Sequence, residues 1–199
     1  MVACKDADAM VTGNIRHYAA SIEKLKHVCD ARKGEPIFGM TMIVFKGRTV
    51  LVADTNVEDF PSSKRLVEIS KSCVRVSKLF GFEPKVAFLS HSTFGKPISR
   101  NTKHVRDAIE TLKEEKVSFD FDGEMQPDVA LNPIYQDIYP FSKIVGKANI
   151  LIMPALHSAA ISTKLMKSFG GAKLIGPLLI GLDLPIEVAP LRSSTSDIL

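Results

Sequence analysis

The sequence predicts an α/β protein whose sheet is mixed, with strands running in both directions. The first observation is that short apolar, β-branched runs alternate with segments in which apolar residues recur every three or four positions. The second is the tight polar turn Lys46-Gly47-Arg48 between two apolar runs, which indicates an antiparallel hairpin. A purely parallel doubly wound sheet contains no such hairpin, so we expect a mixed sheet.

The first half of the chain predicts strands and helices in alternation. Helical spacing favours a helix over residues 14–30, with Asn14 as its N-cap and Gly34 just beyond its end. A second helix is expected to begin after Ser62 and to end at Gly81, because Ser is a favoured N-cap and Gly a favoured helix terminator. Apolar runs predict strands at residues 9–12, 38–45, 50–53 and 85–90.

The second half continues the alternation. Apolar spacing predicts a helix around residues 105–112, and strict alternation of apolar and polar residues predicts a half-buried strand over 117–122. Residues 126–131 suggest a short helix, and a longer one is expected to run to Phe169 before two glycines. Two further strands are expected, at 149–153 and, as the last of the chain, at 174–181.

Both ends of the chain are abrupt. Residues 194–197 resemble the start of a helix, yet the chain stops after barely one turn, which is too short to be stable alone. A strand begins almost at once after the first residue. We therefore expect the chain to be part of a longer protein.

Composition excludes several classes of protein. With 199 residues the chain makes one domain or two small subdomains with a shared core, and 45% hydrophobic residues exclude global disorder. The net charge of +4 is spread without a basic cluster, so no nucleic-acid partner is expected. No signal peptide and no apolar run of membrane-spanning length is present, which predicts a soluble, cytoplasmic protein with no membrane partner.

The cysteines and histidines lack the spacing of a metal site. Cys4, Cys29 and Cys73 are far apart and form no Cys-x-x-Cys motif, so we expect three reduced, buried thiols and no disulfide. No His-Glu-x-x-His or similar ligand pattern is present, and no metal is expected in this chain.

One loop carries the strongest candidate ligand chemistry. It follows the strand at 85–90 and contains Ser90, Ser92, Thr93, Gly95 and Lys96. Hydroxyls and backbone amides at a strand-to-helix junction can hold a phosphate or carboxylate, and the lysine adds positive charge. The alternative interpretation is an ordinary polar connection.

Two other charged groups allow more than one interpretation. Asp120, Asp122, Glu124 and Asp128 form an acidic cluster that suits acid–base chemistry or a divalent cation, although such a run is more often a solvated turn. Arg16 and Lys164 each lie on a predicted helix beside an apolar stripe, and either is an anion contact or, more often for such residues, surface charge.

Several segments resemble one family in the order that the family has them. They are Asp6–Gly13, Val52–Asn56, Gly123–Gln126 with Asp128–Leu131, and Gly176–Leu179. Together they resemble the phosphotransacetylase family over essentially the whole chain. Residues 46–49 and 153–164 are most similar to the phosphotransacetylase-like domain at the C-terminus of bacterial NADP-dependent malic enzymes.

The resemblance implies a fold and its boundaries. It implies a three-layer α/β/α architecture with a mixed sheet and two subdomains, like that of isocitrate and isopropylmalate dehydrogenases. Residues 1–199 would then be one partial phosphotransacetylase-like domain, without the family's N-terminal part and final C-terminal helix.

The same resemblance implies that the family's catalytic groups are missing. Working members have a Ser-Arg pair after the last strand and an Asp shortly beyond, which acts as a base on coenzyme A. A gapless alignment on Pro185 places Pro190, Leu191 and Ser196 at these positions, with Arg192 one residue beyond the expected arginine. Proline and leucine cannot donate to a carbonyl or phosphate, so we expect no catalytic residue in this chain.

The implied function is regulatory. The domain would bind acetyl-CoA or a related acyl-CoA or acyl phosphate as an effector and form a homo-oligomer, without a cofactor of its own. Other domains of the parent would oxidise and decarboxylate malate to pyruvate with NADP and Mg²⁺ or Mn²⁺. The expected effector contacts are Ser90, Ser92, Thr93, Gly95, Lys96, Lys164 and Arg192. The alternatives are a phosphate acetyltransferase or related acyltransferase, and a structural dimerisation module without a ligand.

Overall fold

The computed structural model describes residues 1–198, and at residues 136, 196 and 197 it describes the backbone. The strands are β1 (Met10–Gly13), β2 (Phe38–Phe45), β3 (Arg48–Ala53), β4 (Lys85–Leu89), β5 (Asp120–Met125), β6 (Ile150–Ile152), β7 (Lys173–Ile180) and β8 (Ile186–Ala189). The α-helices are α1 (Tyr18–Leu25), α2 (Ser63–Leu79), α3 (Lys103–Glu114), α4 (Pro127–Leu131), α5 (Leu156–Phe169) and α6 (Thr195–Ile198), and two 3₁₀ turns cover Arg100–Thr102 and Pro133–Gln136.

Six strands form the main sheet in the order β5-β4-β6-β3-β2-β7. The first four of these run parallel to one another, whereas β2 is antiparallel to both of its neighbours. The hairpin between β2 and β3 closes at the pair Phe45 and Arg48. The predicted mixed sheet and the predicted hairpin are therefore confirmed.

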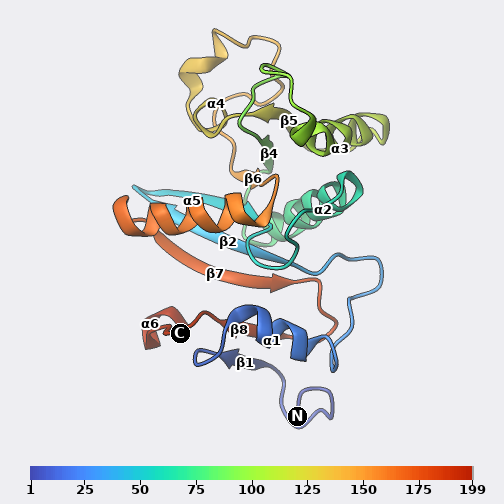
Figure 1. Cartoon of the computed structure of the whole chain (residues 1–199), viewed down its shortest axis with the longest axis vertical. Coiled ribbons are helices and arrows are strands. Elements are labelled where there is room, and N and C mark those ends of the chain that lie inside the picture. The colour runs from blue at the N-terminus through green and yellow to red at the C-terminus, as the bar shows by residue number, and fades with distance from the viewer. Residues whose placement is uncertain (199) are drawn as a thin grey trace.

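Helices cover both faces of this sheet, which gives three layers (Figure 1). On one face, Leu66 and Ile69 of α2 and Leu112 of α3 are fully buried against sheet residues such as Phe88. On the other face, α4 and α5 pack on a second apolar cluster that includes Ala159. Burial of these apolar surfaces is the main force that holds the layers together.

A second, two-stranded parallel sheet pairs β1 with β8 and carries helix α1. Ile22 and Leu25 of α1 form a third apolar cluster with Val188 of β8 and Leu179 of β7, which joins this small sheet to the main one. The small sheet lies at one end of the long axis, and β4, β5 and the loops after them lie at the other (Figure 1).

The first helix is shorter than predicted. It covers Tyr18–Leu25 and its N-cap is His17, so the expected range 14–30 with Asn14 as N-cap is wrong. Asn14 has a φ of 65°, and its amide donates to the Ala189 carbonyl oxygen at 3.1 Å. The residue therefore belongs to the junction between β1 and β8, which is a tertiary contact that periodicity does not report.

Two strand predictions also need correction. The strand expected at 117–122 is β5, which begins at Asp120 because its register is set by pairing with Lys85 of β4. The run 174–181 is β7 and is not the last strand, since β8 follows at Ile186–Ala189. Four residues are too few for a clear periodic signal, and the partner of β8 lies at the far end of the sequence.

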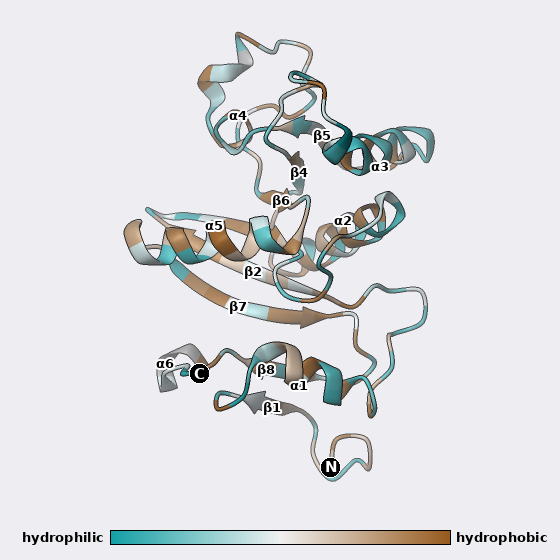
Figure 2. Cartoon of the chain, in the orientation of Figure 1, coloured by the Kyte–Doolittle hydropathy of each residue, from teal (hydrophilic) through white to brown (hydrophobic). Residues whose placement is uncertain are grey.

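The helices differ in how their apolar residues are arranged (Figure 2). Helix α2 begins at the predicted cap, where the Ser62 hydroxyl accepts a hydrogen bond from the Arg65 amide at 3.2 Å. Helix α5 alternates apolar and polar segments along its length, and Ile161, Leu165 and Phe169 are exposed on it. Within residues 1–198, no helix combines the length and apolarity needed to cross a bilayer.

The cysteines follow the prediction in two of three cases. Cys29 and Cys73 are buried free thiols, whereas Cys4 is exposed on the N-terminal turn, so its predicted burial is wrong. Burial raises the pKa of the Cys73 thiol, which keeps it protonated and unreactive.

Candidate functional site

The loop after β4 is held by its own hydrogen bonds. The amides of Ser90, Ser92, Thr93 and Lys96 all donate within the chain, to Met125 O, Ser90 Oγ, Lys96 O and Thr93 O respectively. The Phe94 amide donates to Glu124 O at 2.7 Å. A backbone that would hold a phosphate needs free donors, and these amides are already used inside the protein.

The hydroxyls of the same loop belong to a buried network. Ser92 is fully buried, and its hydroxyl donates to Glu124 Oε1 at 2.6 Å and lies 3.0 Å from the Ser90 hydroxyl. Glu124 is itself 1% exposed and forms an ion pair with Arg106 of α3 at 3.1 Å. The Arg106 guanidinium also donates to Thr102 Oγ1 and to the Ser99 carbonyl oxygen, at 2.7 and 2.8 Å.

This network changes the interpretation of two sequence motifs. Glu124 and Asp122 are not part of a solvated turn, since Asp122 is also buried and accepts a hydrogen bond from the Lys143 amide at 2.7 Å. Ser90, Ser92 and Thr93 do lie together as predicted, with Gly95 and the exposed Lys96 at the loop tip. Their role as a ligand site stays a prediction, and their hydrogen bonds already have a structural use.

The remaining predicted contacts lie elsewhere in the molecule. Lys164 is exposed on α5, and Arg192 follows β8. The Ser90–Lys96 loop and the end of β8 are at opposite ends of the long axis (Figure 1), so one compact ligand cannot contact both. The structure therefore separates the predicted effector residues into three places.

A second strand-end site forms where β1 and β8 finish side by side. The two strands are parallel, with Gly13 opposite Ala189, so their carboxyl ends share one edge. The Arg192 amide then donates to the Asn14 carbonyl oxygen at 2.9 Å, which ties the two following loops together. Carboxyl ends of parallel strands are where open α/β sheets bind ligands.

Gly13 permits this close approach. Its φ is 102°, and a Cβ built at this position would lie 2.3 Å from the Ala189 carbonyl oxygen. No other residue type fits between the strands without moving them apart.

A cavity of about 360 Å³ opens beside this junction. Its lining includes Arg16 and Lys24 with the small polar residues Thr12 and Ser21. The residues that α1 contributes to the lining are Ser21, Lys24 and Leu25. The two cations Arg16 and Lys24 favour an anionic ligand. Among the described residues that line this cavity, none is acidic.

The positions that the resemblance aligns with catalytic groups are beside this cavity. Pro190 and Leu191 are exposed in the loop directly after β8, next to Arg192. The side chain of Ser196 lies outside what the structure describes. Neither Pro190 nor Leu191 has a group that can donate a hydrogen bond from its side chain or move a proton.

Two acids near Tyr18, the buried Asp54 and the partly buried Glu187, have raised pKa values. Burial raises the pKa of Glu187 on β8 to about 7, although its carboxylate accepts a hydrogen bond from the Leu179 amide at 2.8 Å. Burial also raises the pKa of Asp54, against the opposing effect of four backbone amides that donate to it. Tyr18 lies near both acids, and its pKa is raised by burial and by their charges.

Sequence reasoning did not bring together the residues that make this second site. It left Arg16 open as an anion contact or as surface charge, and it gave no binding role to Lys24. The signal available was weak, because nothing local predicts that β1 pairs with a four-residue strand near the other terminus. Within the described residues, no group of three His, Cys, Asp or Glu side chains is arranged to hold a metal ion.

Sequence comparisons give a consistent set of relatives. The family model described as phosphate acetyl/butaryl transferase matches residues 1–199. The NADP-dependent malic enzyme of Rhizobium meliloti is 44% identical over 198 residues, which is 100% of this chain and 26% of that protein. The NADP-dependent malic enzyme of Escherichia coli is 36% identical and is matched over 25% of its length by 94% of this chain. The phosphate acetyltransferase of Bacillus subtilis is 32% identical, over 91% of this chain and 57% of that protein.

The chain thus spans about a quarter of the length of the malic enzymes it matches. Among solved structures, a phosphotransacetylase from Streptococcus pyogenes matches with a TM-score of 0.90 and 30% identity, over 99% of this chain and 61% of that one. The 4-hydroxythreonine-4-phosphate dehydrogenase of Klebsiella pneumoniae matches 92% of this chain and 56% of its own, with a TM-score of 0.53 and 14% identity, and shares the fold alone.

Proposed function

Because this chain belongs to the phosphate acetyl/butaryl transferase family, we propose that it is a regulatory, non-catalytic domain of an NADP-dependent malic enzyme and that its effector is acetyl-CoA. The family resemblance and the 44% identity to a malic enzyme support the placement in such a parent. In that parent, other domains oxidise and decarboxylate malate to pyruvate with NADP and Mg²⁺ or Mn²⁺. This chain holds no cofactor in the proposal.

One observation carries the proposal. The cavity at the ends of β1 and β8 has Arg16 and Lys24 in its lining and no lining acid among the described residues. Coenzyme A has several phosphate groups, so cations can bind it. Acetyl transfer needs in addition a base for the thiol and donors for the developing negative charge, and Pro190 and Leu191 supply neither. The cavity is thus equipped to bind an acyl-CoA without reacting with it.

Binding in the cavity is tested by titrating the purified protein with acetyl-CoA in a calorimeter. We expect Arg16→Gln and Lys24→Gln each to weaken binding about tenfold, which corresponds to the loss of about 1.4 kcal/mol from one charged contact. Lys96→Gln is the matched control, because it removes an exposed cation from the other strand-end loop. Weaker binding in Lys96→Gln alone would move the site to the Ser90–Lys96 loop.

Regulation is tested on malic enzyme activity of the whole protein at increasing acetyl-CoA. The rate should change with acetyl-CoA in the native protein and not in Arg16→Gln, because an effector acts only through different affinity for two states. If acetyl-CoA changes neither the malic enzyme rate nor the calorimetric heat, the domain is a structural module without this effector. Formation of acetyl phosphate that is lost in Arg192→Ala would establish the alternative, a phosphate acetyltransferase.

Homo-oligomerisation is the second part of the proposal. Ile161, Leu165 and Phe169 are four residues apart on α5, so they form one exposed apolar stripe, and their exposed fractions are 59%, 49% and 86%. A stripe of this kind is typical of a surface that another copy covers. Leu165→Glu should give a smaller species than the native protein in light scattering, whereas Lys167→Glu on the same helix should not. Equal masses for all three proteins would contradict this interface.

A further inference from the structure

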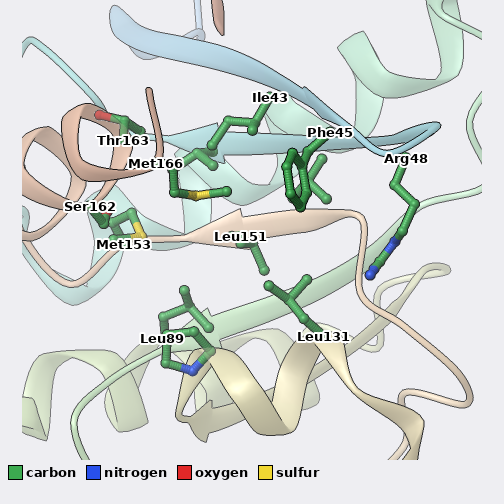
Figure 3. A pocket seen from close by; sticks show the side chains of 13 residues that line it. Ile43, Phe45, Arg48, Leu89, Leu131, Leu151, Met153, Ser162, Thr163 and Met166 are labelled. Atoms are coloured by element: carbon green, nitrogen blue, oxygen red, sulfur yellow. The ribbon is translucent and has the colours of Figure 1, made fainter. Parts of the chain in front are cut away.

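An apolar cavity of about 170 Å³ lies between α5, α4 and the sheet (Figure 3). Phe45 of β2, Leu151 of β6 and Met166 of α5 form three of its walls, and α4 contributes a fourth through Leu131. This space is on the α4–α5 face of the main sheet. It shares no lining residue with the cavity at the ends of β1 and β8.

The two hydroxyls in the lining do not provide polar contacts to the cavity. The Ser162 hydroxyl donates to the carbonyl oxygen of Ser158 at 2.7 Å, and the Thr163 hydroxyl to that of Ala159 at 2.7 Å. Both are therefore satisfied by α5 itself. An occupant of the interior needs no hydrogen-bonding groups along its length.

Arg48 is the exception in an otherwise apolar lining. It begins β3, directly after the hairpin turn, and its guanidinium extends along the rim of the cavity towards α4 (Figure 3). Within the described part of the chain it has no hydrogen bond or ion pair, whereas Arg65, Arg75 and Arg106 each pair with a glutamate. A cation without a protein partner at the mouth of an apolar cavity fits an occupant with one anionic end.

We propose that this cavity binds a medium-chain aliphatic carboxylate, with the hydrocarbon chain between α5 and the sheet and the carboxylate on the Arg48 guanidinium. An apolar cavity of about 150 Å³ takes up benzene, so this one holds roughly six or seven carbon atoms. The inference does not rest on the proposed acetyl-CoA function, since it concerns different residues and a different ligand.

The chain-length dependence of binding tests the apolar interior. Butanoate, hexanoate, octanoate and decanoate are titrated calorimetrically into the purified protein. Affinity should rise by about fourfold for each added methylene and level off near octanoate, when the cavity is full. Hexanol should bind at least tenfold more weakly than hexanoate, because it lacks the charge that Arg48 recognises. No binding at millimolar concentrations, or affinity without dependence on chain length, overturns the proposal.

Substitutions in and beside the lining locate the site. Arg48→Gln should weaken octanoate binding at least tenfold and bring the affinity close to that of octanol. Lys173→Gln, which removes an exposed cation of β7 outside the lining, should not weaken it. Val50→Phe places a ring in the cavity from β3 and should abolish binding. If its circular dichroism shows an unfolded protein, Ser162→Leu fills the space from α5 instead. If Arg48→Gln and a folded cavity-filling variant (Val50→Phe or Ser162→Leu) both bind octanoate as tightly as the native protein does, the ligand associates with the surface only. That result overturns the proposal.

Discussion

The two strand-end regions of this molecule use charged residues in opposite ways. At the ends of β4 and β5, Glu124 and Arg106 pair with each other and with the serine hydroxyls of the loop. At the ends of β1 and β8, Arg16 and Lys24 line a cavity and have no ion pair within the described residues. Polar residues in a strand-end loop can thus either stabilise the fold or bind a ligand. Those whose hydrogen-bonding groups are paired within the protein stabilise the fold, and those without such partners are available to a ligand.

The difference follows from burial. A buried carboxylate must be paired, because an isolated charge in a low-dielectric interior is very costly. Glu124 is buried, and its carboxylate is paired with Arg106 of α3 and with Ser92 of the loop. Arg16 and Lys24 are exposed, so water solvates their charged groups when no anion is bound.

The largest expected effect comes from removing the centre of the buried network. Glu124→Ala leaves the Arg106 guanidinium and the Ser92 hydroxyl without their partner. We expect the free energy of unfolding to fall by about 3 kcal/mol, because one member of a buried pair is lost while the other stays. Urea denaturation measures this loss, and acetyl-CoA affinity should be unchanged in the folded protein.

Two further variants sharpen the comparison. Ser92→Ala removes one hydrogen bond of the same network and should cost about 1 kcal/mol. Asp107→Ala breaks an exposed ion pair with Lys103 on the same helix and should cost less than about 1 kcal/mol. If all three variants were equally stable, the network would not hold this region. If Ser92→Ala weakened acetyl-CoA binding, the loop would be the ligand site after all.

A smaller effect is expected at Glu187 of β8. Its pKa in the folded state is about 7, above the ordinary value of 4.5, so the folded protein holds a proton that the unfolded chain releases. The free energy of unfolding should therefore decrease as the pH rises from about 4.5 to 7. Glu187→Gln imitates the protonated acid and should be more stable than the native protein by roughly 1 kcal/mol at pH 8.

The measurement is a set of urea titrations of both proteins between pH 4 and pH 8. The difference in unfolding free energy should be small near pH 4.5, grow up to pH 7 and then stay constant. The glutamine retains an oxygen that can accept from the Leu179 amide, so the hydrogen bond is kept in the variant. A difference that does not change with pH would show that Glu187 has the same pKa in the folded and unfolded states.

Much of the fold was predictable from local patterns. The β2–β3 hairpin follows from a glycine turn between two apolar runs, and α2 begins at Ser62 as its cap predicts. The first helix was overextended because apolar spacing continues through Ile15 and Cys29, whereas the backbone at Asn14 is held by β8. The strand β8 was not predicted, because a run of four residues is too short to show a clear alternation of apolar and polar positions.

The candidate site was predictable only in part. Arg192 was expected to contact a ligand, and the structure places it beside the junction of β1 and β8. The Ser90–Lys96 loop was expected to contact the ligand, and this role stays a prediction. Five of its amides, those of Ser90, Ser92, Thr93, Phe94 and Lys96, donate within the chain. The partner of Ser92, Glu124, is 32 residues away along the chain, and no spacing rule connects them.

Residue types and their order were enough to predict the alternation of helices and strands and the mixed sheet. These depend on turn chemistry, capping and apolar periodicity, which act over a few residues. The family was predicted separately, from the resemblance of several ordered motifs. The short β1–β8 pairing, the burial of Glu124 and the two cavities required the packed chain. Each depends on segments that meet only after folding, because contacts across the sheet and between the two termini have no counterpart in local sequence.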